Sequence, residues 1–383
     1  MHTSFLEISA KAYRQNIRYI RSEIGEKPEI SAVVKGNAYG HGIQQIVEIA
    51  EKAGIRHFST FSSDEAWEVD SHSIQRSEIM IMGMLHFEEL EKIIRKGISF
   101  YVFDFDRLEK ALEISENIQI RAKIHIEVET GFNRTGFDWK DQEKLTELLL
   151  KNSEFLSLEG LCTHYAGAES VSNYVRVKTQ ISKYQEFRER FTGQNIHFKT
   201  YHTACSAASL IFPETIMDMV RIGIAGYGFW PTTETFFAKL NSLPKANKNP
   251  LKRLITWKSS VMSLKIVEKG EFVGYGNSYL ALTKIKLAII PVGYGQGYSR
   301  FLSNQGQVLI RGQFAKVVGT VTMNSISVDV SRIKGIELGD EVVLIGNQGN
   351  REISVASFSE SSHQVNYELL TRLPKDIPRK IIP

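Results

Sequence analysis

The chain has 383 residues, of which 42% are hydrophobic and 23% charged, a composition typical of a globular protein long enough for two domains. Its formal net charge of +4 is small and scattered, which predicts neither nucleic acid nor a membrane surface as a partner. With only two cysteines, Cys162 and Cys205, we expect no disulfide framework and no metal site. We see no secretory signal and no apolar run long enough to span a membrane, which favours a cytoplasmic enzyme.

Short apolar strands alternate with amphipathic helices from about residue 30 to residue 223. This alternation indicates parallel strands joined by helices, and eight such units can close into a (β/α)₈ barrel. The predicted strands are Ile30–Val34, His57–Phe61, Glu78–Met82, Ile98–Phe103, Arg121–Val128, Leu156–Thr163, Ile196–His202 and Met217–Ile222. The predicted helices are Ile43–Ala53, Asp64–Val69, Phe87–Arg95, Arg107–Ser115, Lys140–Lys151, Tyr174–Phe191 and a short one from Ser206.

The composition changes after the last of these units. Residues 241–250 are polar and include two prolines, which predicts a linker. Strand-like runs separated by glycine turns follow, and this pattern is typical of an antiparallel β domain. We therefore predict an α/β fold with a barrel domain over residues 1–240 and a predominantly β domain over 251–383. The runs are Leu254–Val267, Lys286–Val292, Phe314–Val330 and Glu341–Ile345.

The first predicted strand ends at Lys35, and three glycines then space out Tyr39 and His41. A lysine at the tip of a buried strand is desolvated unless its amine is used, and such an amine can form a Schiff base or carry a proton. The glycines allow a tight turn and a close approach to a ligand. By itself the segment has a simpler interpretation, a strand that ends at a solvated lysine. His41 is interpreted as structural.

Polar residues follow several other predicted strands, where the carboxyl ends of barrel strands form a common face. They are Arg134, His164, His202, Ser206, Arg221 and Gly223. Each alone could be a hydrogen-bonded core residue or half of an ion pair, but together they favour a site. The hydroxyl of Ser206 and the amides around Gly223 suit a phosphate, and a phosphate site facing an imine-forming lysine suggests pyridoxal 5'-phosphate (PLP).

Residues 32–42 resemble the PLP-lysine signature of the bacterial alanine racemases, with Gly36 where alanine is usual. The similarity covers nearly the whole chain, and its domain order, barrel and then β domain, is the one predicted above. Its other landmarks are residues 160–164, 202–208, 218–224, 273–276, 291–295, 318–323 and 366–368.

The resemblance implies a homodimer with active sites shared between subunits. Lys35 would hold PLP as an imine and act as the base on one face of the substrate, and Tyr275 from a partner subunit would be the base on the other. Arg221 would face the pyridine nitrogen and leave it unprotonated. The remaining implied cofactor contacts are Tyr39, Ser206, Gly223, Ile224 and Tyr367 to the phosphate and His164 against the ring or Tyr275. The implied substrate contacts are Arg134, Tyr294 and Met323.

Several positions depart from the family pattern. Glu127 stands where many members carry a carbamylated lysine, and our hypothesis is that it orients Arg134 by a charge-assisted hydrogen bond. The alternative is that Glu127 pairs with another cation such as Lys123. Further departures are Phe132, Asn133, Ile222, Gln296 and Asn324, which leave exclusive use of alanine open.

The sequence therefore predicts a PLP-dependent racemase that interconverts L- and D-alanine and supplies D-alanine for peptidoglycan. One alternative keeps the chemistry but acts on serine, lysine or a broader range of amino acids. A decarboxylase of the same architecture would need a catalytic cysteine in the second domain, whereas both cysteines lie in the predicted barrel. A non-catalytic PLP-binding protein is the alternative from another class, and its members usually consist of the barrel alone.

Overall fold

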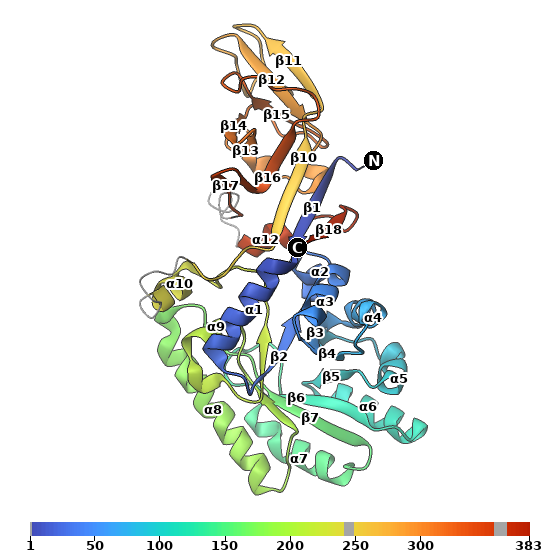
Figure 1. The fold of residues 1–383 in the computed structure, drawn as a ribbon. Helices are drawn as coiled ribbons and strands as arrows, with labels where there is room; N and C mark the ends of the chain where they lie inside the picture. The colour runs from blue at the N-terminus through green and yellow to red at the C-terminus, as the bar shows by residue number, and fades with distance from the viewer. Residues whose placement is uncertain (1, 241–248, 356–365) are drawn as a thin grey trace. The chain divides into compact units, whose positions relative to one another are not determined.

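The computed structural model describes residues 2–240, 249–355 and 366–383 (Figure 1). The chain divides into two compact units. One comprises Ala12–Lys35 and Ile46–Arg253, and the other comprises Met1–Lys11, Gly36–Gln45 and Leu254–Pro383. The predicted domain ranges 1–240 and 251–383 stay a prediction, because two early segments group with the second unit. Most of the predicted linker lies outside the described residues.

The first unit is built on eight parallel strands in the order β8-β7-β6-β5-β4-β3-β2-β9. The two ends of this order meet through a bridge between Cys205 and Arg221, so the sheet is a nearly closed barrel. The predicted fold class is therefore confirmed. The strands are β2 (Glu29–Val33), β3 (His57–Ser62), β4 (Glu78–Met84), β5 (Ser99–Val102), β6 (Ala122–Glu127), β7 (Leu156–Cys162), β8 (Thr200–His202) and β9 (Met219–Ile222).

Helices surround these strands and connect them (Figure 1). They are α1 (Ala10–Ile24), α3 (Ile43–Lys52), α4 (Ser63–His72), α5 (Phe87–Lys96), α6 (Phe105–Ile118), α7 (Gln142–Lys151), α8 (Tyr174–Gly193), α9 (Ser206–Ile211) and α10 (Thr233–Leu240). Local signals fix several ends: Asp104 accepts from the amide of Arg107 at 2.8 Å to begin α6, and Gly97, at φ 74°, ends α5. The sequence did not predict α1 or α10.

The second unit is a β sheet in the order β11-β12-β15-β14-β13-β16-β10-β1-β18, with β17 paired to β16. Among the described residues of this unit, every ladder is antiparallel except that between β1 and β18. The strands are β1 (Ser4–Ser9), β10 (Ile255–Ser260), β11 (Ser263–Val267), β12 (Ile285–Ile290), β13 (Gln307–Ile310), β14 (Gln313–Val317), β15 (Ile326–Asp329), β16 (Glu341–Gln348), β17 (Arg351–Ile353) and β18 (Arg379–Ile382), and helix α12 (Asn366–Thr371) precedes β18.

The barrel core contains polar groups as well as aliphatic ones. β5 is buried along its whole length, as strands covered on both faces are. Three histidines, His57, His125 and His202, are at most 2% exposed, and they lie on β3, β6 and β8. The interior of the barrel therefore carries hydrogen-bonding side chains as well as apolar ones.

Candidate active site

Lys35 lies two residues after the end of β2, at the carboxyl end of the strands. Its side chain is accessible to solvent, yet its pKa is lowered, first because surrounding protein atoms disfavour the ammonium and next because Arg134 repels it. Cys205 and Glu65 act in the opposite direction. An amine that is both reachable and easily deprotonated is suited to act as a nucleophile or a base.

The segment after Lys35, labelled α2 (Lys35–Tyr39) in Figure 1, is a left-handed turn. Gly36 has φ 62°, and the next three residues have φ between 51° and 54° although none of them is glycine. Each such residue costs about 1–2 kcal/mol, a strain that is typical of functional sites. Asn37 holds the turn by accepting from the amides of Gly42 at 3.0 Å and of Ile43 at 3.1 Å.

His41 is buried at the end of this turn. Its Nδ1 lies 2.9 Å from the carbonyl oxygen of Tyr39 and 3.0 Å from that of Ala38, which ties the ring to the strained backbone. Burial lowers the pKa of His41 to about 4. These contacts agree with its structural interpretation. The Tyr39 ring meets the edge of Tyr367 at a centroid distance of 6.0 Å, so two of the predicted phosphate ligands are neighbours.

Arg221, on β9, is only 5% exposed. One terminal nitrogen donates to the carbonyl and Nδ1 of His202 at 2.7 and 2.6 Å, and the other donates to the carbonyls of Thr163 and Thr203 at 2.7 and 3.1 Å. The Nε–H has no acceptor within the described residues. The guanidinium is thus anchored by four contacts and keeps one donor for a ligand.

The loops after β8 and β9 also meet. The Ser206 hydroxyl, at the start of α9, accepts from the amide of Gly223 at 3.0 Å. The neighbouring amide of Ile224 donates to no acceptor in the described part of the chain. A hydroxyl beside an uncommitted amide is the kind of donor set that binds a phosphate oxygen.

The loop after β6 carries Arg134. Glu129 shapes this loop by accepting from the amides of Gly131 and Asn133, the latter at 2.8 Å, and Asn133 adopts φ 58°. The Arg134 guanidinium lies over the Phe132 ring at 4.2 Å.

His164, which follows β7, lies on the same ring. The centroids of His164 and Phe132 are 5.5 Å apart, and both residues line a small pocket together with Arg134. Burial, followed by the nearby cations Arg221, Arg134 and Lys35, lowers the pKa of His164 to about 3, so its imidazole is neutral at physiological pH. From the sequence, Phe132 was noted only as a departure from the family pattern. In the structure its ring contacts both the His164 ring and the Arg134 guanidinium.

Glu127 does not contact Arg134 as hypothesised. Its carboxylate is buried and accepts from the Thr135 hydroxyl at 2.8 Å, and neither Arg134 nor Lys123 bonds to it in the described chain. Burial raises the pKa of Glu127, against the opposing effects of the Thr135 bond, Arg134 and Arg221. The carboxylate therefore acts on the two arginines only through space, because the hydroxyl of Thr135, the residue after Arg134, bonds to it instead.

The remaining predicted residues lie in the β unit. Tyr275 is 77% exposed between Gly274 at φ 75° and Gly276 at φ 67°, so the two glycines form a turn that presents the phenol outward. Tyr294 and Met323 are also exposed and are brought together by backbone bonds, one of which joins the Gly295 amide to the Met323 carbonyl at 2.8 Å.

Comparison with known proteins identifies the family. Residues 8–231 match the alanine racemase N-terminal domain, and residues 254–381 match the alanine racemase C-terminal domain. The chain belongs to the alanine racemase family. The alanine racemase of Leptospira interrogans is 33% identical over 388 residues, which cover 100% of this chain and 96% of that protein.

Solved racemases share the fold. Bacillus anthracis alanine racemase with bound L-Ala-P has a TM-score of 0.89 at 30% identity, covering 100% of this chain and 96% of that one. Bartonella henselae alanine racemase, with covalently bound pyridoxal phosphate, has a TM-score of 0.83 at 26% identity over the full length of both chains. A histidine racemase of Leuconostoc mesenteroides has a TM-score of 0.88 at 25% identity, covering 100% and 98%.

These matches make the chain an amino-acid racemase, an isomerase of the alanine racemase type. The family is in general PLP-dependent. Within the described residues, no helix is long and apolar enough to cross a membrane, and no group of three acidic, histidine or cysteine side chains could hold a metal ion.

Proposed function

We propose that this chain is a PLP-dependent alanine racemase that interconverts L- and D-alanine as a homodimer. The observation that carries the proposal is the convergence on one barrel rim of a reachable lysine of lowered pKa, an anchored arginine with a spare donor, and a hydroxyl–amide pair. Family membership supports the same conclusion.

The donor chemistry fits PLP. Lys35 supplies the primary amine that would bind its aldehyde, Ser206, Gly223 and Ile224 supply neutral donors for its phosphate, and Arg221 supplies an N–H for its ring nitrogen. Tyr39 and Tyr367 are proposed as further phosphate ligands, and His164 as a neutral contact of the ring or of Tyr275. When bound, PLP draws electrons from the α-carbon of the substrate.

Lys35 would remove or return the α-proton on one face of the substrate. Its lowered pKa increases the fraction of neutral amine at physiological pH, which a base requires. Tyr275 from the second subunit would serve the opposite face. Inversion needs both bases, since the proton taken from one face must be replaced from the other.

Arg221 and Arg134 would have separate tasks. Arg221 is always cationic and buried, so it would keep the ring nitrogen unprotonated and limit charge delocalisation into the ring. This limit favours racemisation over side reactions. Arg134, exposed on its loop above Phe132, would bind the carboxylate of the amino acid.

The exposed surface of the β unit supports a shared site. Tyr275, Tyr294 and Met323 all stand on loops of this unit with their side chains in solvent, where a second copy of the chain could receive them. Tyr294 and Met323 would complete the substrate pocket of that copy. In the cell, the D-alanine formed would supply peptidoglycan synthesis in the cytoplasm.

A second candidate is racemisation of another amino acid. A histidine racemase has nearly the same fold as this chain, so the fold alone does not fix the side chain of the substrate. Phe132, Gln296 and Asn324 differ from the family pattern around the proposed pocket. Serine, lysine and broader specificity are therefore retained as alternatives.

The deciding experiment is α-proton exchange in D₂O over a panel of L- and D-amino acids with the PLP-loaded protein. The proposal expects exchange and inversion to be fastest with alanine, and the Lys35→Ala variant to lose both. Faster turnover of serine or lysine would transfer the function to the second candidate. If the purified protein is yellow but exchanges the α-proton of no amino acid, it is a non-catalytic PLP-binding protein. If sedimentation shows that a monomer is fully active, the site shared between subunits is refuted.

A further inference from the structure

Two buried histidines in the barrel touch each other across an intervening strand. His125 lies on β6 and His202 on β8, and β7 is hydrogen-bonded between them. Strands two positions apart are separated by roughly 9–10 Å. Yet His125 Nδ1 and His202 Nε2 are 2.9 Å apart, and the ring centroids are 5.0 Å apart.

Gly160 on β7 makes this contact possible. It pairs with His125 in the β6–β7 register and with Thr200 in the β7–β8 register, so it stands between the two strands beneath the rings. A Cβ at residue 160 would lie 2.3 Å from His125 Nδ1 and 2.7 Å from His202 Nε2. Any larger residue there would drive the rings apart.

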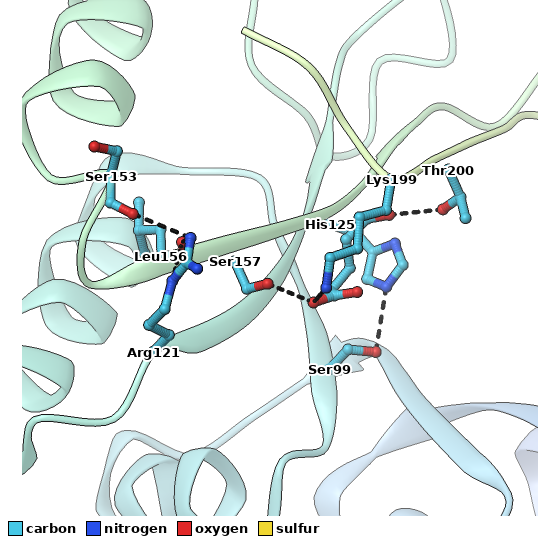
Figure 2. Close-up of polar contacts among 9 residues, drawn as sticks. Ser99, Arg121, His125, Ser153, Leu156, Ser157, Lys199 and Thr200 are labelled. Atoms are coloured by element: carbon cyan, nitrogen blue, oxygen red, sulfur yellow. Dashed lines mark hydrogen bonds and ion pairs between the residues drawn. The ribbon is translucent and has the colours of Figure 1, made fainter.

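The contact belongs to a longer series of hydrogen bonds. Arg221 on β9 lies 2.6 Å from His202 Nδ1, and His125 Nε2 lies 3.2 Å from the Ser99 hydroxyl on β5, a contact drawn in Figure 2. The Ser99 hydroxyl in turn donates to the carbonyl of Ile79 on β4 at 3.1 Å. Five of the eight barrel strands contribute one member each.

Both ends of the series have a fixed polarity. Arginine can only donate, so His202 Nδ1 must accept and the proton of this ring must be on Nε2. That proton is given to His125 Nδ1, which leaves the His125 proton on Nε2 to be given to Ser99. A backbone carbonyl can only accept, so Ser99 gives its own proton to Ile79. Only one set of tautomers satisfies every member.

The surroundings keep the two rings neutral. His125 and His202 are 2% and 0% exposed, and burial is the first cause of the lowered pKa of both. His57 and then Arg221 add to it at His125, and Arg221 and then the two other histidines add to it at His202. His57 is one of these histidines, and Tyr101 lies against both rings at 6.1 Å. A protonated ring would place two donors face to face at one of the links.

We propose that His202 and His125, made adjacent by Gly160, form a one-way hydrogen-bond chain that positions Arg221. This series of hydrogen bonds engages one terminal nitrogen of the Arg221 guanidinium through His202 Nδ1. The Nε–H then remains as the donor for the ring nitrogen of PLP. His202 and His125 are positioning residues, since neither needs to touch the substrate. Only the last step, delivery of Nε–H to the cofactor, rests on the proposed function.

The first test is independent of activity. In ¹⁵N-histidine-labelled protein, the ring nitrogen shifts of residues 125 and 202, assigned from the two His→Asn variants, report which nitrogen carries the proton. The proposal expects Nε2–H and a bare Nδ1 in both rings, unchanged as the pH is lowered toward acid unfolding. A proton on Nδ1 of either ring, or an imidazolium, would overturn the chain.

The second test measures its effect on the active site of the PLP-loaded enzyme. Gly160→Ala should break the His125–His202 link, change the visible absorbance of the bound cofactor and lower kcat about tenfold or more, with KM for alanine changed much less. Gly193→Ala is the matched control, because a Cβ at residue 193 meets nothing within 4 Å. Unchanged absorbance and kcat in a folded Gly160→Ala protein would refute the positioning role.

A pair of variants at residue 125 covers the case in which Gly160→Ala does not fold. Asparagine places an oxygen near the position of Nδ1 and can still accept from His202, whereas phenylalanine cannot. His125→Asn should therefore keep most of the kcat and the cofactor spectrum that His125→Phe loses, and equal losses would refute the chain. If the wild-type protein racemises no amino acid but its two rings show the expected tautomers, the proposed function is refuted and the hydrogen-bond series through His202 and His125 is still supported.

Discussion

The buried histidine His57 gives a quantitative prediction about acid stability. It lies on β3 in the barrel, 2% exposed, with Nδ1 2.8 Å from the Ser31 hydroxyl. Burial lowers its pKa from 6.5 to about 4. Between pH 6.5 and about pH 4, His57 is therefore protonated in the unfolded chain but neutral in the folded barrel. The free energy of unfolding falls as the pH is lowered through this range.

The size of the effect follows from the two pKa values. Below both pKa values, His57 lowers the free energy of unfolding by about 3 kcal/mol in total. Between about pH 8 and pH 5 it lowers the free energy of unfolding by about 2 kcal/mol. His57→Asn keeps a polar group for Ser31 but cannot titrate. The variant should therefore lose about 2 kcal/mol less stability than the wild type over the same pH interval.

Urea unfolding of both proteins at the two pH values measures this difference directly. The other buried histidines are present in both proteins, and burial, the first cause of their lowered pKa, is unchanged by the substitution, so most of their contribution cancels. The measurement at the higher pH removes the constant effect of the substitution. If wild type and variant lose stability in parallel as the pH falls, His57 is not held neutral in the folded barrel and the reasoning from burial is refuted.

Three further predictions concern single residues. Phe132→Leu removes the ring beneath the Arg134 guanidinium and should raise KM for alanine about two- to fivefold with little change in kcat; an unchanged KM in steady-state kinetics would contradict it. Gly40→Ala should destabilise the protein by about 3 kcal/mol or more in urea unfolding, because the new Cβ would lie 1.8 Å from the Leu370 carbonyl oxygen and φ is 79°. Tyr275→Phe should slow racemisation by about 10²–10⁴ while α-proton exchange in D₂O persists for one enantiomer, and equal loss for both would argue against two separate bases.

The order of the barrel elements could be predicted from the sequence because each unit carries its own local signals. β-branched runs, capping residues such as Asp104 and the closing Gly97 specify strands and helices without knowledge of the rest of the chain. β8 was harder. It begins at Thr200 because the Ile196 amide still bonds to Phe191 at the end of α8, a competition that the apolar pattern of residues 196–202 does not reveal.

The second unit shows the limit of local reading. β1 pairs with β10, about 250 positions away, and with β18 near the end of the chain. Nothing in residues 4–9 specifies these partners, because strand pairing depends on which surfaces the whole fold leaves free. The long run Leu254–Val267 divides into two strands for the same reason.

The candidate site was predictable as far as single residues go. Lys35 and Arg221 could be selected because each lies at or just beyond the carboxyl end of a predicted buried strand, and the resemblance implied their roles. The contacts that the side chains of the site make with their surroundings could not be predicted from the sequence. The contacts of Phe132 with His164 and Arg134 depend on how Glu129 shapes the loop after β6. The need for glycine at residue 160 follows only from the positions of His125 on β6 and His202 on β8.

The charge distribution on the rim bears on Glu127, one of the departures from the family pattern. Arg134 and Arg221 both lower the pKa of Lys35, and the one buried carboxylate nearby, Glu127, is bonded to Thr135 and has a raised pKa. Burial is the first cause of the lowered pKa of Lys35, and the two arginines add to it while Cys205 and Glu65 oppose it. Two consequences would act together: burial and the arginines favour release of the proton of Lys35, the proposed base, and Arg134 has no ion-pair partner in the described chain to compete with the substrate carboxylate that it is proposed to bind. A glutamate that bound Arg134 directly would weaken both effects, so the Thr135 contact fits the proposed chemistry better than the hydrogen bond first expected.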